Sequence, residues 1–578
     1  MHSREEVRRF LLEDRLKLAT VSGVLTTRPG LIDWADRDLV EIEVITTKSY
    51  QVRPNCGNRE PVLVEASPGC YGNAVGLRNP GMEEGLRELQ ALRATRPLRA
   101  LLNVSLSADN PHDFAVLARR FQAVADLLEL NFSCPHASNG YGSAIGSDPR
   151  AVRLFTAEAR ASTSAPLFVK LTPNVLDIAR IAREAVRAGA DGISAINTVG
   201  PELFREPLTG TAVLNNPPSH RGGKSGTWIL EKALEAVREI RQELGKAVPI
   251  LGMGGVATGD DARRMREAGA NAVGIGSAFI RIRSQAEIPA YLRVLKHDAE
   301  TGTRETAGFL SMEFLMRYRA FRIRRIRAAG PDLRVFTLEG SLEACPSQYV
   351  FLFLPGVGEK PFSVARIDPL TFIIRRRGPF TSALFDCKPG EPILVRGPYG
   401  AAAPSSPCRT AFVVSGGSGL AVAGILAEHL RRQGKLISLF HGAAAPQEAA
   451  LASFLEEYRP PLPVTTVVDE GRQGRILLGL ERSLREENPA ELACYTIGPL
   501  GFLKAAAEVQ SACGLDPKAI FLCFEPESLC GVGACGQCEC GGSLLCKEGT
   551  FVSLRYLLDK GIGMIDHCSP QPALPLVP

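Results

Sequence analysis

The amino-acid sequence predicts an α/β protein in which a (β/α)8 barrel precedes a second module, made of a small antiparallel β-barrel and a nucleotide-binding domain. Three observations predict this class. Apolar runs alternate with amphipathic helical segments over the first half, short strands punctuated by Gly and Pro follow, and six of the 15 cysteines crowd between Cys523 and Cys546. At 578 residues the chain is too long for one hydrophobic core, so several domains are expected.

Eight candidate strands predict the first module. Each is a short apolar run, and the helical segments between them, such as residues 177–190 and 229–244, repeat apolar residues at spacings of three and four. Eight parallel strands are the number that closes a (β/α)8 barrel. The candidate strands span residues 16–22, 39–47, 99–105, 127–133, 166–171, 192–197, 248–254 and 272–278.

Polar residues and glycines that follow these strands are the candidates for a site, because the active sites of such barrels lie at the C-terminal ends of the strands. Glycines after the last two strands let the backbone approach a phosphate, and a mononucleotide flavin such as FMN fits this half. Taken singly, a glycine is more often an ordinary turn and a lone cysteine a small buried hydrophobe. The candidates are Ser22, Gly23, Lys48, Asn103, Asn131, Cys134, Lys170, Asn197, Thr198, Gly254, Gly255, Gly276 and Ser277.

The pattern of apolar residues changes after the polar stretch 299–308, which we interpret as a linker. Dense Gly and Pro between short alternating strands predict a small antiparallel barrel. Residues 412–443 then run strand, Gly-rich turn, helix and strand, an arrangement that offers backbone N–H groups to a pyrophosphate. The turn GGSG is a weak signal alone, since it is not the GxGxxG fingerprint. The strand candidates of the small barrel are residues 320–326, 333–340, 348–355 and 372–377.

The strongest single motif is the cysteine-rich run at residues 529–546. Cys530, Cys535 and Cys538 have the spacing of a plant-type two-iron ferredoxin loop, and Cys546 supplies a fourth thiolate. Cys540 remains an alternative ligand because the gap before Cys546 is short. A structural zinc site is the rival interpretation, although zinc sites usually pair two short cysteine hairpins. The run therefore predicts a [2Fe-2S] cluster.

Charge and composition exclude some partners. The net charge of +5 is small for this length and comes with no long run of Lys or Arg, so no nucleic-acid partner is expected. The N-terminal 20 residues mix acidic and basic side chains without an apolar stretch, so we expect neither a signal peptide nor a membrane span, and a cytoplasmic protein. The Pro-rich tail at 563–578 is expected to be disordered.

The first half resembles the class 1 dihydroorotate dehydrogenases in seven motifs: TTKS (46–49), GNAVGLRNPG (72–81), NFSCP (131–135), VKLTPN (169–174), INT (196–198), GGKSG (222–226) and GMGGV (252–256). The resemblance implies that Cys134 is the catalytic base and that Lys170 lies by the flavin. The FMN contacts that it further implies are Ser22, Gly23, Lys48, Asn103, Asn131, Lys170, Gly226, Gly254, Gly255, Gly276 and Ser277. His136 and Ser277 depart from the commonest pattern, with Asn and Thr as the usual residues. The implied substrate-binding residues are Lys48, Asn73, Gly76, Leu77, Asn131, Asn197 and Thr198.

The second half resembles the ferredoxin-reductase-like electron-transfer subunit of the class 1B dihydroorotate dehydrogenases. The motifs are KPFS (360–363), GPFTS (378–382), GPYG (397–400), GGSG (416–419) and IGP (497–499). Lys360 replaces the usual Arg, and Ile497 replaces a common Cys. No Arg follows the strand LISLF closely, which favours NAD over NADP. The resemblance implies FAD at Lys360, Pro361, Phe362, Ser363, Gly378, Thr381 and Ser382, and NAD at Gly416, Gly417, Ser418, Gly419 and Gly498.

Together the two resemblances imply one chain that fuses catalytic and electron-transfer subunits. It would oxidise dihydroorotate to orotate and pass electrons through FMN, [2Fe-2S] and FAD to NAD+, as a homodimer paired through the barrel. The rivals are a dihydropyrimidine dehydrogenase acting on uracil or thymine, and an electron carrier with a non-catalytic barrel. The expected domains are 1–305 (FMN barrel), 306–318 (linker), 319–406 (FAD barrel), 407–518 (NAD domain), 519–562 ([2Fe-2S] domain) and 563–578 (tail).

Overall fold

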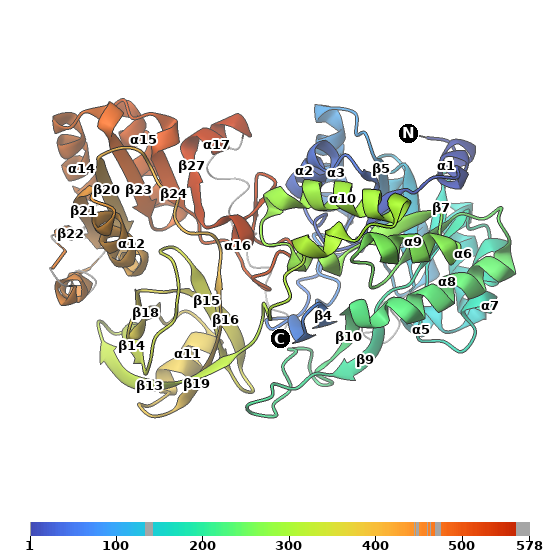
Figure 1. Ribbon diagram of the computed structural model, residues 1–578, viewed down its shortest axis with the longest axis horizontal. Coiled ribbons are helices and arrows are strands. Elements are labelled where there is room, and N and C mark those ends of the chain that lie inside the picture. The colour runs from blue at the N-terminus through green and yellow to red at the C-terminus, as the bar shows by residue number, and fades with distance from the viewer. Residues whose placement is uncertain are drawn as a thin grey trace. The chain divides into compact units, whose positions relative to one another are not determined.

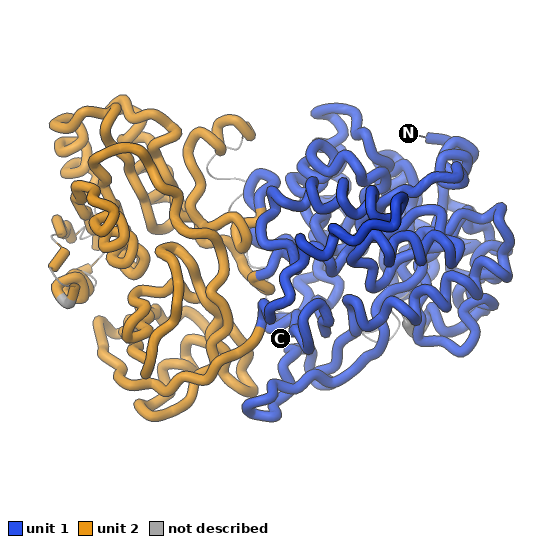
Figure 2. Tube along the Cα trace, viewed as in Figure 1, with its two compact units in different colours: residues 1–316, 532–543 blue, residues 317–531, 544–578 orange. Residues whose placement is uncertain are grey.

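The computed structural model divides the chain into two compact units (Figures 1 and 2). Unit 1 comprises residues 1–316 and 532–543, and unit 2 comprises residues 317–531 and 544–578. The short segment 532–543 therefore packs with the N-terminal half, although it lies near the end of the chain. The structure describes residues 2–132, 143–443, 445–446, 450–458, 461–462, 464–468 and 475–561.

Unit 1 is built on a closed barrel of eight strands, and all eight predicted strands are confirmed. Each pairs in parallel with its neighbours, in the order β1-β12-β11-β8-β7-β6-β5-β2. Their residues are almost all buried, because helices cover the outside and side chains fill the inside. The strands are β1 (Leu18–Thr20), β2 (Ile42–Thr46), β5 (Leu101–Leu106), β6 (Leu127–Asn131), β7 (Leu167–Lys170), β8 (Gly192–Ala195), β11 (Ile250–Met253) and β12 (Ala272–Ile275).

The helices of unit 1 follow the apolar spacing of the sequence, and the two predicted at 177–190 and 229–244 are α7 and α8. Side-chain oxygens of Asn110, Asp148, Asp177 and Thr258 cap four of these helices at their N-termini. The helices are α1 (Arg4–Leu12), α2 (Pro29–Asp38), α3 (Met82–Thr95), α4 (Pro111–Phe121), α5 (Ser143–Gly146), α6 (Pro149–Ala161), α7 (Ile178–Arg187), α8 (Leu230–Leu244), α9 (Gly259–Glu267) and α10 (Ile288–Thr301).

An apolar cluster fills the N-terminal end of the barrel. Strand residues such as Leu101, Leu127 and Phe168 pack there with Val7 and Leu11 of α1. Helix α1 thus closes this end, and its first turn is fixed by a capping box between Ser3 and Glu6. Because one end of the barrel is closed by apolar packing, polar chemistry is confined to the other end.

A four-stranded antiparallel sheet, which the sequence interpretation did not include, is inserted between the barrel elements. Its order is β3-β4-β10-β9. Strand β4 carries Asn73 and strand β10 ends at Gly226, so two predicted site residues lie on this sheet. The strands are β3 (Leu63–Ser67), β4 (Cys70–Asn73), β9 (Val199–Leu203) and β10 (Arg221–Gly226).

The predicted linker at 299–308 is folded onto unit 1. Helix α10 continues to Thr301, and a 3-10 helix follows at Glu305–Phe309. Asp298 accepts hydrogen bonds from the Thr303 hydroxyl at 2.5 Å and from the Thr306 backbone N–H at 2.8 Å. Polar residues here satisfy one another, which is why a stretch without apolar periodicity is nonetheless ordered.

Unit 2 begins with a seven-stranded antiparallel sheet in the order β16-β15-β19-β13-β14-β18-β17. The four predicted strands are present as β13, β14, β15 and β18, but in the described part of the chain no hydrogen-bonded pairing joins the end strands β16 and β17 to close the predicted barrel. Strand β13 pairs with β19 over its first half and with β14 over its second, so it serves both parts of the sheet. The strands are β13 (Arg319–Ala328), β14 (Leu333–Leu338), β15 (Tyr349–Leu354), β16 (Gly358–Ser363), β17 (Arg366–Ile367), β18 (Leu370–Arg375) and β19 (Pro392–Tyr399).

The second sheet of unit 2 has six strands in the order β22-β21-β20-β23-β24-β27, of which only β27 is antiparallel. The predicted sequence of strand, Gly-rich turn, helix and strand corresponds to β20, a 3-10 turn at Gly417–Gly419, α12 and β21. The elements are β20 (Thr410–Gly416), β21 (Leu436–Ala443), β22 (Val464–Val468), β23 (Leu492–Ile497), β24 (Ile520–Cys523), β27 (Phe551–Ser553), α11 (Pro379–Asp386), α12 (Leu420–Arg432), α14 (Arg475–Glu486), α15 (Leu500–Ala512), α16 (Leu545–Glu548) and α17 (Leu554–Asp559).

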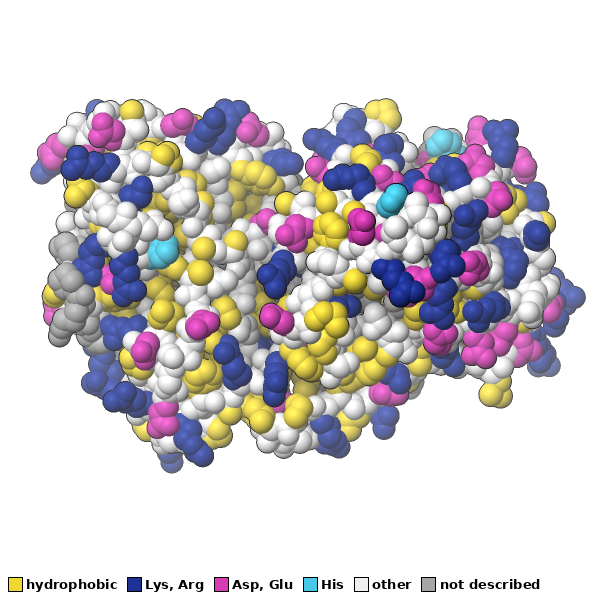
Figure 3. Space-filling view, viewed as in Figure 1, with side chains coloured by type: hydrophobic (Ala, Val, Ile, Leu, Met, Phe, Trp, Pro, Cys, Tyr) yellow, Lys and Arg dark blue, Asp and Glu magenta, His cyan; other side chains and the backbone are white. Residues whose placement is uncertain are grey.

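Surface charge is mixed in sign. On the face shown in Figure 3, Lys and Arg side chains are scattered among Asp and Glu. Among the described residues, no helix combines the length and the apolar character that crossing a bilayer requires.

Candidate functional site

The C-terminal ends of the barrel strands bring several predicted site residues together. Asn131 and Lys170 are partners in the register of β6 and β7, and Asn103 is the partner of Thr46 across β5 and β2. Asn103, Asn131 and Lys170 are all buried. Large polar side chains are seldom buried without a role, so this end of the barrel, which we call the barrel mouth, is the candidate site.

A chain of hydrogen bonds crosses the barrel mouth. The Asn131 Nδ2 donates to Ser49 Oγ at 3.0 Å, and the Ser49 and Ser105 hydroxyls lie 2.9 Å apart. Ser105 Oγ in turn donates to Glu129 Oε1 at 3.2 Å, while Ser22 Oγ lies 3.4 Å from Ser49 Oγ. Four strands or strand ends are thus joined through their polar side chains. The chain fixes the orientation of the Asn131 amide.

Ser49, Ser105 and Glu129 are residues that the sequence analysis missed. Strand alternation could have found two of them, since Ser105 lies two residues after Asn103 and Glu129 two residues before Asn131. Asn197 extends the same network, because its Nδ2 lies 3.5 Å from Asn131 Oδ1. Its own Oδ1 accepts from the backbone N–H of Thr198 at 2.8 Å.

Four buried oxygens at the barrel strands have no hydrogen-bond partner in the described part of the chain. They belong to Asn103 (Oδ1), Glu129 (Oε2), Ser194 (Oγ) and Thr198 (Oγ1). An unpaired buried polar atom costs about 1–3 kcal/mol, so native proteins rarely leave several in one place. A polar ligand at the barrel mouth would satisfy them. The residues present therefore fit a flavin ring or a pyrimidine, both of which carry amide N–H groups.

Lys48 lies against the backbone at Gly23. A Cβ at Gly23 would be 3.1 Å from Lys48 Nζ, and Gly23 has a φ of +87°, which favours glycine. A side chain at position 23 would therefore displace the lysine. This contact brings together two predicted residues from the ends of β1 and β2.

Glycines after β11 and β12 form close backbone contacts. A Cβ at Gly255 would lie 2.8 Å from Leu230 Cα, in the first turn of α8, and Gly254 and Gly255 have φ values of +125° and +80°. Gly276 is packed against Val21, and Ser277 opens a 3-10 helix. Backbone free of side chains at these turns is what a phosphate needs for close approach, so the residues fit the phosphate of FMN.

The loop that carries the predicted substrate-binding residues Asn73, Gly76 and Leu77 is held by asparagines. Asn73 Nδ2 donates at 3.2 Å to the Gly223 carbonyl and lies 3.2 Å from Ser225 Oγ. Gly76 and Leu77 both adopt positive φ, +77° and +56°. A leucine in this conformation is uncommon and marks a tightly constrained turn. Side chains of Asn55 and Asn79 donate to the carbonyls of Gly76 and Leu77, respectively, at 3.2 and 2.8 Å.

Gly226 is required by a backbone contact on the inserted sheet. A Cβ there would be 2.0 Å from the Gly69 carbonyl oxygen, and its φ is +103°. Cys134 and His136 lie outside the described residues. The predicted catalytic base therefore remains a prediction from the sequence.

In unit 2 the two predicted FAD motifs lie side by side. Phe362 of β16 packs against Phe380 of α11, with ring centroids 6.0 Å apart. Thr381 Oγ1 accepts from the backbone N–H of Gly378 at 3.0 Å, and the Ser382 N–H donates to the Gly378 carbonyl at 2.9 Å. These bonds shape the first turn of α11. Lys360, Pro361 and Ser363 lie on the same strand as Phe362, β16.

The two predicted NAD motifs also meet. A Cβ at Gly419 would be 2.9 Å from the carbonyl oxygen of Ile497, and a Cβ at Gly416 would be 3.3 Å from the ring of Phe502. Gly498 packs against the same ring. The ends of the parallel strands β20 and β23 thus adjoin, as expected for a nucleotide site at the carboxyl edge of a parallel sheet.

All four predicted cluster cysteines are buried. Cys535 and Cys538 lie in segment 532–543 of unit 1, whereas Cys530 and Cys546 belong to unit 2. Gly531, Gly533 and Gly536 have φ values between +68° and +80°, which lets neighbouring N–H groups turn toward sulfur. The alternative ligand Cys540 is buried and disulfide-bonded, so the structure does not support it as a thiolate ligand. A [2Fe-2S] cluster takes four thiolates, so the chemistry of these four side chains is that of the predicted cluster.

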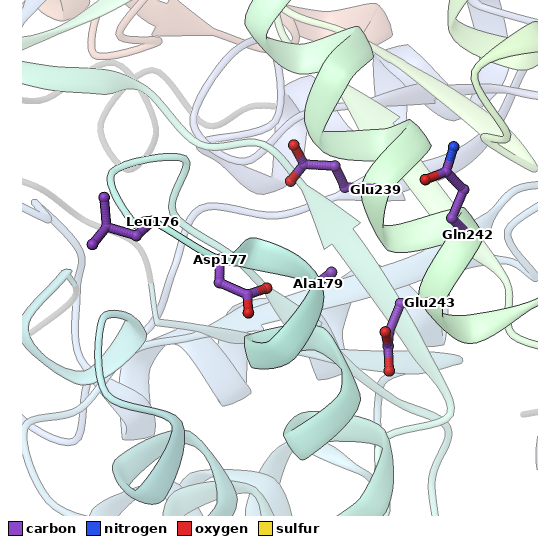
Figure 4. A pocket seen from close by; sticks show the side chains of 6 residues that line it. All are labelled: Leu176, Asp177, Ala179, Glu239, Gln242 and Glu243. Atoms are coloured by element: carbon purple, nitrogen blue, oxygen red, sulfur yellow. The ribbon is translucent and has the colours of Figure 1, made fainter.

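Within either unit, the described residues include no group of three or more His, Cys, Asp or Glu side chains placed to hold one metal ion. A groove lies elsewhere, on the outside of the barrel between α7 and α8 (Figure 4). It has a volume of about 420 Å³ and includes Asp177, Glu239 and Glu243. None of the predicted site residues lines it, and we do not assign it a role in the chemistry.

The closed barrel with a polar mouth defines a (β/α)8 enzyme with its site at the C-terminal ends of the strands. Residues 18–287 match the family model described as dihydroorotate dehydrogenase. The chain belongs to the dihydroorotate dehydrogenase family.

Three relatives illustrate the similarity. The catalytic subunit named dihydroorotate dehydrogenase B (NAD(+)) of Methanopyrus kandleri is 38% identical over 265 residues, 45% of this chain and 81% of the relative. The subunit of the same name from Pyrococcus abyssi is 36% identical over 308 residues, 52% and 98% of the two chains. A protein named dihydroorotate dehydrogenase A (fumarate) from Lacticaseibacillus paracasei is 37% identical over 263 residues, 45% and 87%.

Proposed function

We propose that this chain oxidises dihydroorotate to orotate in pyrimidine biosynthesis and delivers the electrons to NAD+. The observation that carries the proposal is the barrel mouth of a dihydroorotate dehydrogenase family member, where Asn131 and Asn197 are hydrogen-bonded together beside unpaired buried oxygens. The proposed order of carriers is FMN, [2Fe-2S], FAD and NAD+. FMN, when bound, supplies a hydride acceptor at its N5 atom.

The residues of the barrel mouth have distinct proposed roles. Lys48 and the backbone amides of Gly76 and Leu77 bind the substrate carboxylate, because an anion needs a cation and N–H donors. Asn73, Asn131, Asn197 and Thr198 bind the ring amides in plane. Lys170 holds a positive charge beside the flavin N1 and C2 carbonyl, where reduction places negative charge.

Cys134 is the proposed base. It removes the proton from C5 of dihydroorotate while the hydride leaves C6, so that a carbon–carbon double bond forms in orotate. An ordinary cysteine thiol has a pKa of about 8.5, so the thiolate needed for this step becomes more abundant as pH rises.

Unit 2 is proposed to be the electron-transfer half of a fused enzyme, with a ferredoxin-reductase-like arrangement. Lys360 to Ser363 with Gly378, Thr381 and Ser382 would hold FAD, and the turn Gly416 to Gly419 with Gly498 would hold NAD. Cys530, Cys535, Cys538 and Cys546 would ligate the cluster. The adjoining motifs on β16 and α11, and on β20 and β23, support these assignments.

We further propose a cytoplasmic homodimer paired through the barrel. Sedimentation equilibrium of the full chain tests the dimer, and a purely monomeric protein would contradict it.

An anaerobic titration tests the function. Dihydroorotate is added to the purified protein and flavin bleaching is followed, and NAD+ is then added and NADH absorbance recorded. Bleaching followed by NADH is the expected result. Bleaching without NADH would contradict the proposed acceptor, and fumarate would then be tried because a relative carries that name. A response to dihydrouracil alone would favour a dihydropyrimidine dehydrogenase, and no response to either would favour an electron carrier.

A further inference from the structure

A buried ion pair lies between two strands of the seven-stranded sheet. Arg396 of β19 forms a bidentate contact with Glu359 of β16, with Nε 2.8 Å from Oε2 and Nη2 2.5 Å from Oε1. Their side chains are 1% and 0% exposed. Removing two charges from water costs solvation energy that can exceed the attraction between them. A buried ion pair is therefore better evidence of a fixed geometry than of added stability.

Arg396 reaches beyond its carboxylate to the first predicted cluster ligand. Its Nη1 donates to the backbone carbonyl of Cys530 at 2.9 Å and to the hydroxyl of Tyr399 at 2.8 Å. The guanidinium carbon lies 3.8 Å from the centroid of the Phe351 ring. Four hydrogen bonds and the stacked ring thus hold the guanidinium in one orientation, which fixes the position of the Cys530 carbonyl.

The residue after Cys530 is packed against the same group. A Cβ at Gly531 would be 3.0 Å from the rings of Phe351 and Tyr399, and its φ is +80°. Just past Tyr399, the backbone N–H of Gly400 donates to the carbonyl of Cys546 at 3.0 Å. The end of β19 thus holds the backbone of both predicted ligands that belong to unit 2.

Glu359 connects this group to the predicted FAD strand. It directly precedes Lys360 on β16, and Tyr318 donates its hydroxyl to Glu359 Oε2 at 2.6 Å. Glu359 is held from both sides, by Arg396 and by Tyr318. One rigid polar group therefore spans from the FAD motif to Cys530 within unit 2.

We propose that Arg396 is a positioning residue for the iron–sulfur cluster, which fixes the Cys530 backbone and sets a balanced buried charge next to it. The proposal rests on the cluster assigned under the proposed function. Reduction potentials of such clusters depend on nearby net charge and on hydrogen bonding. Arg396 favours the reduced cluster, which carries one more negative charge, and Glu359 offsets this effect.

Opposite charge changes provide the test. Full-length Arg396→Met, Glu359→Gln, the double variant and Arg396→Lys are prepared anaerobically, and iron and acid-labile sulfide per chain are measured. Redox titration followed by electron paramagnetic resonance then gives the midpoint potential and the spectrum of the reduced cluster. Arg322→Met is the matched control, because Arg322 in the same sheet also donates to a backbone carbonyl at 2.9 Å, that of Gly390, without touching a cysteine.

We expect Arg396→Met to lower the equilibrium constant for cluster reduction about tenfold, equal to ~59 mV for one electron, and Glu359→Gln to raise it. The double variant lies between them. Arg396→Lys keeps the charge but loses the fork, so its potential stays near wild type while its resonance spectrum changes. Arg322→Met matches wild type in both.

The outcomes separate the two proposals. Wild-type protein without iron and sulfide would overturn both the cluster and the role of Arg396. A wild-type cluster whose potential and spectrum are the same in all Arg396 and Glu359 variants would overturn only the latter. If Arg396→Met does not fold, Glu359→Gln and Arg396→Lys decide, because both retain a positive charge at 396, and wild-type behaviour in both counts against the proposal.

Discussion

Two buried polar groups in this molecule differ in how completely their hydrogen bonds are satisfied. At the barrel mouth, Asn103, Glu129, Ser194 and Thr198 each keep a buried oxygen without a partner among the described residues. In the group around Arg396 and Glu359, every carboxylate oxygen and guanidinium nitrogen is hydrogen-bonded. The first arrangement is what a binding site needs before its ligand arrives, and the second is what a structural clamp needs.

The largest effect is expected where the barrel mouth carries out chemistry. Replacing Cys134 by Ser removes the proposed base, and general-base catalysis is worth about 10²–10⁴ in rate. We expect flavin reduction by dihydroorotate to slow by that factor in stopped-flow absorbance, with FMN still bound. Cys345→Ser, a change at an exposed cysteine of unit 2, is the control and should retain the wild-type rate. An unchanged rate in Cys134→Ser would move the chemistry away from position 134.

The substrate side of the mouth is tested by its tight turn. In Gly76→Ala the new Cβ would lie 2.8 Å from the Asn58 backbone nitrogen, at a φ of +77°. We expect KM for dihydroorotate to rise about tenfold or more, since 1.4 kcal/mol of lost binding is tenfold. Gly210→Ala is the matched control, because Gly210 has a similar φ of +69° but nothing within 4 Å. Equal KM values in the two variants would show that this turn does not contribute to substrate binding.

A smaller effect is expected from the hydrogen-bond chain. Ser105→Ala removes the hydroxyl that joins Ser49 to Glu129, and one hydrogen bond contributes about 0.5–1.5 kcal/mol. We expect kcat/KM for dihydroorotate to fall about two- to tenfold. Ser107→Ala, on the same segment, removes a hydroxyl that has no partner among the described residues and should leave kcat/KM unchanged. If both variants behave alike, the chain does not orient the site.

The sequence predicted the barrel because its strands are apolar on both faces and its helices repeat at three and four, so each element carries its own signal. The inserted sheet was missed because β4 and β10 consist largely of polar residues and glycine, which resemble loops. Glu129 lies inside an apolar run, so only its spacing of two residues from Asn131 could have placed it on the same face of the strand.

The Arg396 group could not have been found from the sequence for a different reason. Glu359 and Arg396 are 37 residues apart on strands that both pair with β15, and each looks like an ordinary surface charge. Only the pairing of strands brings them together. Long-range electrostatic partners follow from the fold rather than from local spacing.

Glu88, a partly buried acid, shows what happens without the cation that Glu359 has. The described residues hold no ion pair to Glu88 on α3, and burial, with the charge of Glu84 as the next cause, raises the pKa of Glu88 to about 7. A carboxyl whose pKa is raised by folding destabilises the folded state when it ionises. This cost is absent below the unfolded pKa of about 4.5, grows from there, and is complete above pH 7.

Glu88→Gln should therefore stabilise the barrel at pH 8 and leave its stability unchanged at pH 4. The expected gain at pH 8 is about 1–3 kcal/mol, since each unit of pKa shift corresponds to about 1.4 kcal/mol. Thermal release of FMN, followed by its fluorescence, measures this at both pH values. Glu235→Gln, on an exposed position of α8, controls for the loss of a surface charge. A gain of equal size at pH 4 and pH 8 would show that packing, rather than the ionisation of an unpaired, partly buried acid, distinguishes Glu88 from Glu359.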